Sequence, residues 1–388
     1  MNKKYISLIY LYTFLSTFIL FYACDTLYYL EKGISSSGYM FFVTTSYFIK
    51  VVLEIPSGIF ADKYSKKKIL FIGNALFLIS TLLFIISKSY ALFVLAIIIS
   101  SVNNCITTGI ANSLLYDFNN KEDKFNKLIF RNSFSYNISY MLAMILGGIV
   151  GQKYGLINTY YLTLIPTIIN FIVICLIKEP RKNNDDIVIN KSIFKNALVE
   201  IKNNNTIINM IITNSIIFSI IKIVEESHPD YASSLGISVF EIGIYTSLIL
   251  VFCIIGNYIG SKIKKESYGK IIKFSPLFCG LCIFLLGILN SCYGILFLLL
   301  FYIFSESFDN IFLTIVHDSV TSKSRVTIES IISLILCICG LILSLLSSLA
   351  LKQIELYQLY IVLGVIIIVY GIINLVIKND SFWTVPTK

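Results

Sequence analysis

The sequence predicts an all-α polytopic membrane protein with twelve transmembrane helices. The composition, the length of the apolar stretches and the distribution of basic residues all support this class. Of the 388 residues, 56% are hydrophobic and only 14% are charged, and the mean hydropathy is +0.82. A soluble domain has about 25% charged residues, so this chain has too few to cover a surface that faces water. The composition therefore disfavours soluble enzymes and nucleic-acid-binding modules.

The apolar stretches are about as long as the roughly 20 residues that a spanning helix needs. They are continuous, whereas strands of a membrane β-barrel alternate apolar and polar residues. The predicted spans are residues 5–30, 38–60, 69–87, 90–116, 132–151, 156–177, 206–224, 239–259, 271–290, 293–316, 327–350 and 356–377. The first stretch is too long for the core of a signal peptide, so we expect it to remain as a helix.

The distribution of Lys and Arg predicts the orientation. With the N-terminus inside, 25 of the 31 Lys and Arg residues fall in cytoplasmic segments and 4 in outer loops. Cytoplasmic loops of membrane proteins carry such an excess. We therefore predict a multi-pass protein of the bacterial cytoplasmic membrane with both termini in the cytoplasm. The net charge of +9 is interpreted as this bias and not as affinity for nucleic acid.

A weak repeat predicts two halves. The polar segment 178–205 is interpreted as a cytoplasmic linker between six-helix bundles at 1–177 and 206–378, and 379–388 as a cytoplasmic tail. The loop after the second span, which begins Gly58-Ile-Phe-Ala-Asp62, is echoed after the eighth span, which reads Gly256-Asn-Tyr-Ile-Gly260. Two six-helix halves in parallel repeat are the architecture of the major facilitator transporters, which bind substrate near the middle of the membrane.

The same loop carries a family resemblance. Gly58-x-x-x-Asp62-Lys63-x-x-Lys66-Lys67-Lys68 resembles the signature loop of the major facilitator superfamily, with Ser65 where the family usually has Gly. Glu54–Gly58 and Arg325–Thr327 resemble bacterial drug-efflux members. The resemblance implies a secondary transporter that works by alternating access, and we expect it to be a monomer. It also implies a cytoplasmic gate made of Gly58, Asp62, Lys63, Lys66, Lys67 and Arg325, for which a merely solvated basic turn is the alternative.

Three carboxylates within spans are candidates for proton coupling. Ionisable residues inside a membrane are costly and mark function by default. Glu306 and Asp309 lie about one turn apart in the tenth span, and Asp25 lies in the outer third of the first. A desolvated carboxyl group beside another carboxylate binds its proton more tightly. We therefore predict proton coupling at Glu306 first and Asp309 second; Asp25 is either a third coupling residue or a contact for a cationic substrate.

Other polar residues within spans are predicted to line a substrate cavity. The set is Tyr22, Asp25, Lys50, Glu54, Asn103, Asn104, Thr107, Ser215, Ser219, Lys222 and Glu306. Lys50 and Glu54 could equally form a structural ion pair, because they lie four residues apart on one helix face. The Asn, Ser and Thr side chains could serve only as interhelical hydrogen-bonding groups. Tyr28 and Tyr29 are interpreted as part of an interfacial belt.

Together these features predict proton-coupled efflux of a small amphipathic or cationic compound, such as a drug, an antibiotic or a peptide. The alternatives are an uptake permease for a polar nutrient and, more remotely, a membrane sensor that transports nothing. Two departures from the family bear on coupling: the fourth span has no Arg, and Gly147-Gly148-x-x-Gly151 lacks the Pro of the antiporter motif. The expected partners are a small molecule, protons and the lipid bilayer.

We expect no enzyme activity, no cofactor and no metal site. The chain has two His and nine Cys, and nearly all the Cys lie in apolar stretches. Cys279-x-x-Cys282 has the spacing of a redox or metal motif, but it lies within a span with no His nearby. Free Cys packs as a small hydrophobic residue, which is the favoured interpretation here.

Overall fold

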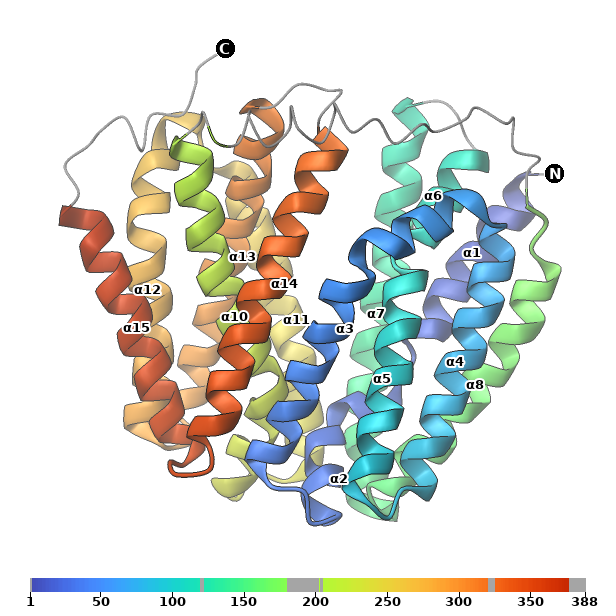
Figure 1. The fold of residues 1–388 in the computed structure, drawn as a ribbon, viewed down its shortest axis with the longest axis horizontal. Coiled ribbons are helices and arrows are strands. Elements are labelled where there is room, and N and C mark those ends of the chain that lie inside the picture. The colour runs from blue at the N-terminus through green and yellow to red at the C-terminus, as the bar shows by residue number, and fades with distance from the viewer. Residues whose placement is uncertain (1, 119–121, 180–201, 203–204, 320–324, 377–388) are drawn as a thin grey trace. The chain divides into compact units, whose positions relative to one another are not determined.

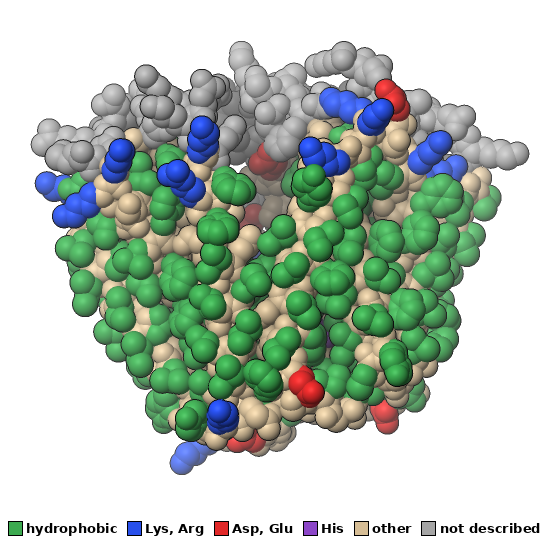
Figure 2. Space-filling model, turned by 180° about the vertical axis from the view of Figure 1, so that it is seen from behind, with side chains coloured by type: hydrophobic (Ala, Val, Ile, Leu, Met, Phe, Trp, Pro, Cys, Tyr) green, Lys and Arg blue, Asp and Glu red, His purple; other side chains and the backbone are tan. Residues whose placement is uncertain are grey.

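The computed structural model describes residues 2–118, 122–179, 202, 205–319 and 325–376. Within these ranges the chain forms helices joined by short connections (Figure 1). Ten of them are long and apolar enough to cross a membrane. Hydrophobic side chains cover the middle of the face seen in Figure 2, while Lys and Arg side chains lie mostly toward one edge. An all-helical membrane protein is therefore confirmed, and a total of twelve spans stays a prediction.

The first predicted span is not one helix. Helix α1 (Asn2–Thr17) stops, a 3₁₀ turn η1 (Leu20–Ala23) follows, and α2 (Asp25–Glu31) completes the segment. The Leu20 N–H donates to the Thr163 hydroxyl at 3.1 Å, and the Phe14 carbonyl accepts from the Ser139 hydroxyl at 2.5 Å. Irregular backbone at membrane depth is tolerated where neighbouring side chains satisfy it. The expectation of a continuous helix over 5–30 is wrong because these partners come from other helices.

The fourth predicted span is also interrupted. Helix α5 (Tyr90–Thr107) and helix α6 (Ile110–Phe118) meet at Gly109, whose φ is +76°. A residue with a side chain adopts this left-handed conformation only at a cost, so glycine suits the bend. The hydroxyls of Thr107 and Thr108 donate to carbonyls in the last turn of α5. Both interruptions lie in the N-terminal part of the chain.

The packing divides the chain into two compact units. The first comprises Met1–Ser35, Phe48–Ile187 and Ile237–Ser247. Its helices are α1, α2, α5, α6, α4 (Lys66–Ile86), α7 (Glu122–Tyr154) and α8 (Ile157–Leu176). An aromatic cluster fills one part of this unit, where the rings of Phe21 and Tyr160 stack at 4.3 Å. Tyr28 and Tyr29 are buried in the same cluster, so the expectation that they form an interfacial belt is wrong.

The second unit comprises Ser36–Tyr47, Val188–Gly236 and Leu248–Lys388. Its helices are α10 (Asn205–Ser234), α12 (Tyr268–Leu289), α13 (Gly294–Ser319), α14 (Arg325–Ala350) and α15 (Leu356–Val376), with a short 3₁₀ turn η2 (Lys265–Ser267) before α12. Helices α12 and α15 pack side by side. Helix α10 continues to Ser234, ten residues beyond the predicted end of its span, and Pro229 lies inside the helix without ending it.

Two long helices contribute to both units. Helix α3 (Ser36–Lys63) begins in the second unit and continues in the first from Phe48, and α11 (Val239–Lys262) begins in the first and continues in the second from Leu248. Figure 1 shows α3 as a continuous helix, and α11 is likewise a single helix over Val239–Lys262. They precede the two loops that carry the sequence repeat. The division into bundles at 1–177 and 206–378 stays a prediction, and the packing units depart from it at the starts of these helices.

Candidate functional site

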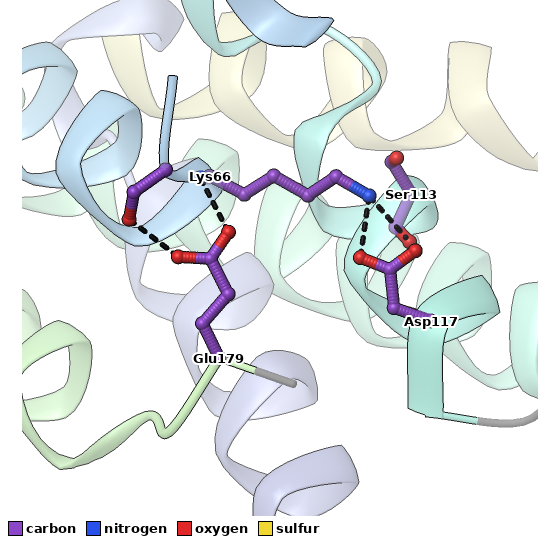
Figure 3. Close-up of polar contacts among 5 residues, drawn as sticks. Lys66, Ser113, Asp117 and Glu179 are labelled. Atoms are coloured by element: carbon purple, nitrogen blue, oxygen red, sulfur yellow. Dashed lines mark hydrogen bonds and ion pairs between the residues drawn. The ribbon is translucent and has the colours of Figure 1, made fainter. Parts of the chain in front are cut away.

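The signature loop is held by the carboxylate of Glu179, which follows the end of α8. Ser65 caps α4 by accepting the Lys68 N–H at 3.3 Å, as a serine before a first helical turn typically does. Its hydroxyl donates to the Glu179 carboxylate, which also accepts the Lys66 N–H at 2.7 Å (Figure 3). Serine at this position, where the family usually has glycine, therefore has a defined local role.

Lys66 ties the same loop to α6. Its ammonium group lies 2.5 Å from the Asp117 carboxylate and 3.3 Å from the Ser113 carbonyl (Figure 3). The Lys66 side chain is 8% exposed, and a buried cation needs such partners. Lys67 donates to the Cys175 carbonyl at 2.6 Å. Lys66 thus has buried partners within the first unit, and a gating role for Lys66 and Lys67 stays a prediction.

The rest of the predicted gate is less well described. Gly58, Asp62 and Lys63 lie in the last turns of α3, and Arg325 begins α14. Their side chains lie outside the part of the chain that the structure describes. A gating role for these four residues stays a prediction.

Asp25 begins α2 and accepts the Thr26 N–H at 2.7 Å. A carboxylate at a helix N-terminus is favoured by the helix dipole, so Asp25 has a structural task whatever else it does. Tyr22 is half-buried with its ring against the edge of Phe21. Lys50 and Glu54 are half-buried on α3, and both interact with neighbouring groups.

Several predicted cavity residues bond to their own helix. The hydroxyls of Ser215 and Ser219 are buried and donate to carbonyls four residues earlier, both at 2.7 Å. Thr107 does the same toward Asn103, which is buried, while Asn104 is exposed. This back-bonding is common for Ser and Thr in helices. Their place in a substrate cavity stays a prediction.

Two carboxylates of α13, Glu306 and Asp309, each accept a hydrogen bond from an amide on another helix. The Asn257 amide of α11 donates to the Glu306 carboxylate at 2.7 Å, and the Asn214 amide of α10 donates to Asp309 at 3.3 Å. Lys222 forms its ion pair with Glu225, three residues later on α10. The charges of Asp309, Glu225 and Lys222 also act on Glu306. The second unit therefore gathers predicted residues from α10 and α13 into one polar cluster.

Glycines bring α11 close enough for this contact. A Cβ atom at Gly256 would lie 2.6 Å from the Ile303 carbonyl oxygen, and one at Gly260 would lie 2.8 Å from the Ser307 carbonyl oxygen. The Ser307 hydroxyl donates to the Gly256 carbonyl at 2.8 Å. Small residues allow such close backbone contact between membrane helices. The repeat motif thus predicts a contact that positions Asn257 beside Glu306.

Sequence reasoning missed Asn257 and Asp230. Asn257 lies inside the repeat motif, so its position between two glycines was the available signal. Asp230 accepts the Ser36 and Tyr39 hydroxyls of α3, but it lies beyond the predicted end of its span, and nothing in the sequence joins it to these residues. Within the described ranges, no three His, Cys, Asp or Glu side chains converge on a possible metal site.

Residues 6–344 match the family model of the Major Facilitator Superfamily, so the chain belongs to this family of membrane transporters and is not an enzyme. An uncharacterized transporter of Buchnera aphidicola subsp. Acyrthosiphon pisum is 27% identical over 136 residues, which are 35% of this chain and 34% of the relative. A second uncharacterized transporter, from Buchnera aphidicola subsp. Schizaphis graminum, is 22% identical over 134 residues. The chain thus matches about a third of the length of these curated relatives.

Solved transporters have a similar fold. A variant of the nucleoside transporter NupG superposes with a TM-score of 0.80 at 14% identity, covering 95% of this chain and 99% of that one. A D-xylose-proton symporter superposes with a TM-score of 0.73 at 12% identity, covering 99% of both chains. At this level of identity the similarity shows the fold alone.

Proposed function

We propose that this transporter exports a small amphipathic or cationic compound in exchange for protons, in the manner of the drug-efflux-like members of its family. It would work by alternating access, as a monomer of a bacterial cytoplasmic membrane with both termini inside. Glu306 is proposed as the main proton site and Asp309 as the second. The observation that carries the proposal is the Glu306 carboxylate within a membrane helix, held by the Asn257 amide at 2.7 Å.

The chemistry of the amide supports proton exchange at this position. Asn offers both donors and an acceptor on one side chain. Asn257 can therefore donate to a charged carboxylate and, after rotation of the amide, accept from the protonated acid. Asn214 offers the same pair of groups to Asp309. A carboxylate held this way can change protonation without losing its hydrogen bond.

The charge balance of the cluster supports a cation as its ligand. Lys222 is paired with Glu225 on its own helix, and α13 contributes the Glu306 and Asp309 carboxylates to the same cluster. Charge within a membrane is costly unless it is paired. A proton and a cationic substrate are both able to balance the charge of these carboxylates, and competition between them for one site is the basis of exchange.

The test is proton flux in everted membrane vesicles that carry a pH-sensitive dye. Substrates come first from a growth comparison of cells with and without the protein on a panel of toxic compounds. Adding a substrate should release protons from the vesicles, Glu306→Gln should abolish the release and Asp309→Asn should reduce it. Glu355→Gln, at an exposed glutamate, should leave it unchanged. Full flux in Glu306→Gln would show that the proton site is elsewhere.

Uptake of a polar nutrient is the second candidate. The Asn214 and Asn257 amides favour it, because amides can also recognise the hydroxyl and amide groups of a polar solute. If the protein is an uptake system, its deletion should leave the sensitivity of the cells to the toxic panel unchanged. The cells that lack it should instead fail to grow on one nutrient. A sensor would show no flux in either assay.

A further inference from the structure

The connection between α11 and α12 carries a dense group of basic residues. Five of the twelve residues from 262 to 273 are lysines, and only Glu266 is acidic. The lysines are Lys262, Lys264, Lys265, Lys270 and Lys273. Helix α11 ends at the first of them, and α12 begins at Tyr268 after the short turn η2. All five therefore lie at the same end of two consecutive helices, and all except Lys273 are exposed. We name these five lysines the α11–α12 basic surface.

The corresponding loop of the first half uses its lysines differently. There the Lys66 ammonium group is bound to the Asp117 carboxylate, and Lys67 donates to a carbonyl at the end of α8. Three lysines of the α11–α12 basic surface form no ion pair or side-chain hydrogen bond with any residue that the structure describes: Lys264, Lys270 and Lys273. The same place in the sequence repeat thus carries lysines with internal partners in one half and lysines open to an external partner in the other.

Exposed aromatic rings lie on the same helix faces as these lysines. Phe274 and Phe278 follow Lys270 by four and eight residues, so the three side chains share one face of α12. Both rings are exposed. On α11, the exposed ring of Tyr258 lies one turn before Lys262, whose ammonium group is 5.6 Å from the ring centre. Each face therefore has a cation at the helix end and an aromatic ring one turn further along the helix.

We propose that the α11–α12 basic surface binds the phosphate of an anionic phospholipid, whose acyl chains lie against the rings of Tyr258, Phe274 and Phe278. Lys and Arg side chains gather toward one edge of the apolar surface (Figure 2), which is the level of lipid headgroups. The end of α11 and the start of α12 are predicted to face the cytoplasm, where anionic lipids attract basic segments beside membrane helices.

The net charge of the lipid decides which lipid fits. Phosphatidylglycerol presents a phosphate with no cation of its own, so it balances lysines that have no carboxylate partner. Phosphatidylcholine carries a quaternary ammonium group beside its phosphate and gains little from a surface with five lysines and one glutamate. The surface therefore selects an anionic lipid over a zwitterionic one.

The aromatic rings favour a lipid over a soluble phosphate compound. A soluble anion contacts only the exposed lysines, and salt screens such contacts strongly. A phospholipid adds contact between its acyl chains and the rings that lie one turn below the lysines. The general excess of basic residues in cytoplasmic loops accounts for lysines here, but it does not require rings on the same helix faces.

The experiment measures phosphatidylglycerol binding to the full-length protein in detergent by native mass spectrometry. The test variant replaces Lys264, Lys270 and Lys273 with Gln. Its affinity for phosphatidylglycerol should fall at least tenfold, because three of the five cations are removed. Binding of phosphatidylcholine should be weak in the wild type and unchanged in the variant.

A matched control removes the same number of charges elsewhere. It replaces three exposed lysines from connections that are predicted to lie outside, Lys88, Lys153 and Lys352, with Gln. This control should bind phosphatidylglycerol with the wild-type affinity. An equal loss in the control would overturn the proposal, because it would show that the total charge of the protein governs binding and not this surface.

Phe274→Ala distinguishes a lipid from a soluble anion. The change keeps every lysine and removes one ring, so it should weaken phosphatidylglycerol binding by less than the triple variant does. Glycerol 1-phosphate, which has the same phosphate and no acyl chain, should not displace the lipid. Displacement by glycerol 1-phosphate, together with wild-type affinity in Phe274→Ala, would overturn the assignment to a lipid.

Wild-type affinity for phosphatidylglycerol in a folded triple variant would overturn the proposal directly. Folding is checked by gel filtration and thermal unfolding. Should the triple variant fail to fold, a titration of the wild type at low and high salt decides: binding should weaken as salt rises, and binding that salt does not change overturns the proposal. The result does not depend on proton coupling, because lipid binding needs neither a substrate nor a pH gradient.

Discussion

The starts of α3 and α11 attach to their units by different chemistry. The start of α3 attaches to α10 and α14 through a carboxylate, three serine hydroxyls and a tyrosine hydroxyl, and we name this set of contacts the α3 clasp. The first third of α11 packs against α7 through Gly148 and Gly243, whose backbones are in direct contact. A Cβ atom at Gly243 would lie 2.5 Å from the Met144 carbonyl oxygen.

These two helices occupy corresponding places in the sequence repeat. They therefore share a position in the fold and differ in the side chains that make their contacts. Both cross from one packing unit to the other near the end of their first third. One attachment needs particular side chains, and the other needs their absence. The α3 attachment should therefore be sensitive to loss of a hydrogen-bonding group, and the α11 attachment to addition of a single methyl group.

The largest effect is expected from Gly243→Ala. The added methyl group meets a backbone oxygen that cannot turn away, and overpacking of this kind costs about 1–3 kcal/mol. Gly148→Ala, on the other side of the same contact, should cost less because its nearest atom would be 3.0 Å away. Thermal unfolding in detergent, followed with a thiol-reactive dye, gives both values. Ile244→Val, at an exposed neighbour, is the control, and a Gly243→Ala protein as stable as this control would contradict the assignment.

A smaller effect is expected from Gly340→Ala, where α14 contacts α3. Here the added methyl group meets the Tyr47 ring, and a side chain can move where a backbone cannot. The expected cost is about 1 kcal/mol. Tyr47→Leu should relieve the overlap, so the double variant should be more stable than the sum of the two single changes predicts. Simple additivity in this cycle would mean that the ring does not lie over Gly340.

Ser37→Ala and Ser348→Ala should each cost about 1 kcal/mol, the typical net value of one hydrogen bond. Each hydroxyl donates to a backbone carbonyl that the other substitution leaves in place. The costs should therefore add in the double variant to within about 0.5 kcal/mol. Thermal unfolding of the two single variants and the double variant measures this. A double variant no less stable than either single one would show that the two bonds are not independent.

The smallest effect is expected from Ser247→Ala in the α11 attachment. The Ser247 hydroxyl is 3.1 Å from the Met141 carbonyl and 2.9 Å from the Gly243 carbonyl of its own helix. The Ser247 hydroxyl therefore bonds both to α7 and to its own helix, so only part of its hydrogen bonding joins the two helices. The change in unfolding free energy should stay within about 0.5 kcal/mol. A cost equal to that of Ser37→Ala would remove the distinction between the two attachments.

Sequence patterns identified the membrane class, the family and most helix positions. These features follow from local chemistry, since a continuous apolar stretch must span the bilayer as a helix and the signature loop is contiguous in the chain. The repeat around Gly256 and Gly260 indicated two related halves, and the structure adds that these glycines contact α13 closely. Lys66 and Lys67 were recognised as functional candidates, but their partners Asp117 and the Cys175 carbonyl were not.

The errors share one cause, which is that distant segments changed local preferences. The break after Thr17 depends on hydroxyls of α7 and α8, and a pattern of apolar residues carries no information about them. Tyr28 and Tyr29 have a composition typical of an interfacial belt, yet the rings of Phe84, Phe93 and Tyr160 surround them. Helix α10 continues past Pro229 because packing outweighs the local signal for an end.

The order of residues was enough to establish that this chain is a membrane-embedded transporter, because burial of apolar side chains in lipid is decided one segment at a time. The order of residues was not enough to predict that Asp230 bonds to Ser36 and Tyr39, or that Gly148 packs against Gly243. Those contacts connect residues roughly 95 to 195 positions apart. They exist only once the helices have packed, because a hydrogen bond or a backbone contact needs two surfaces in place and each segment carries only one.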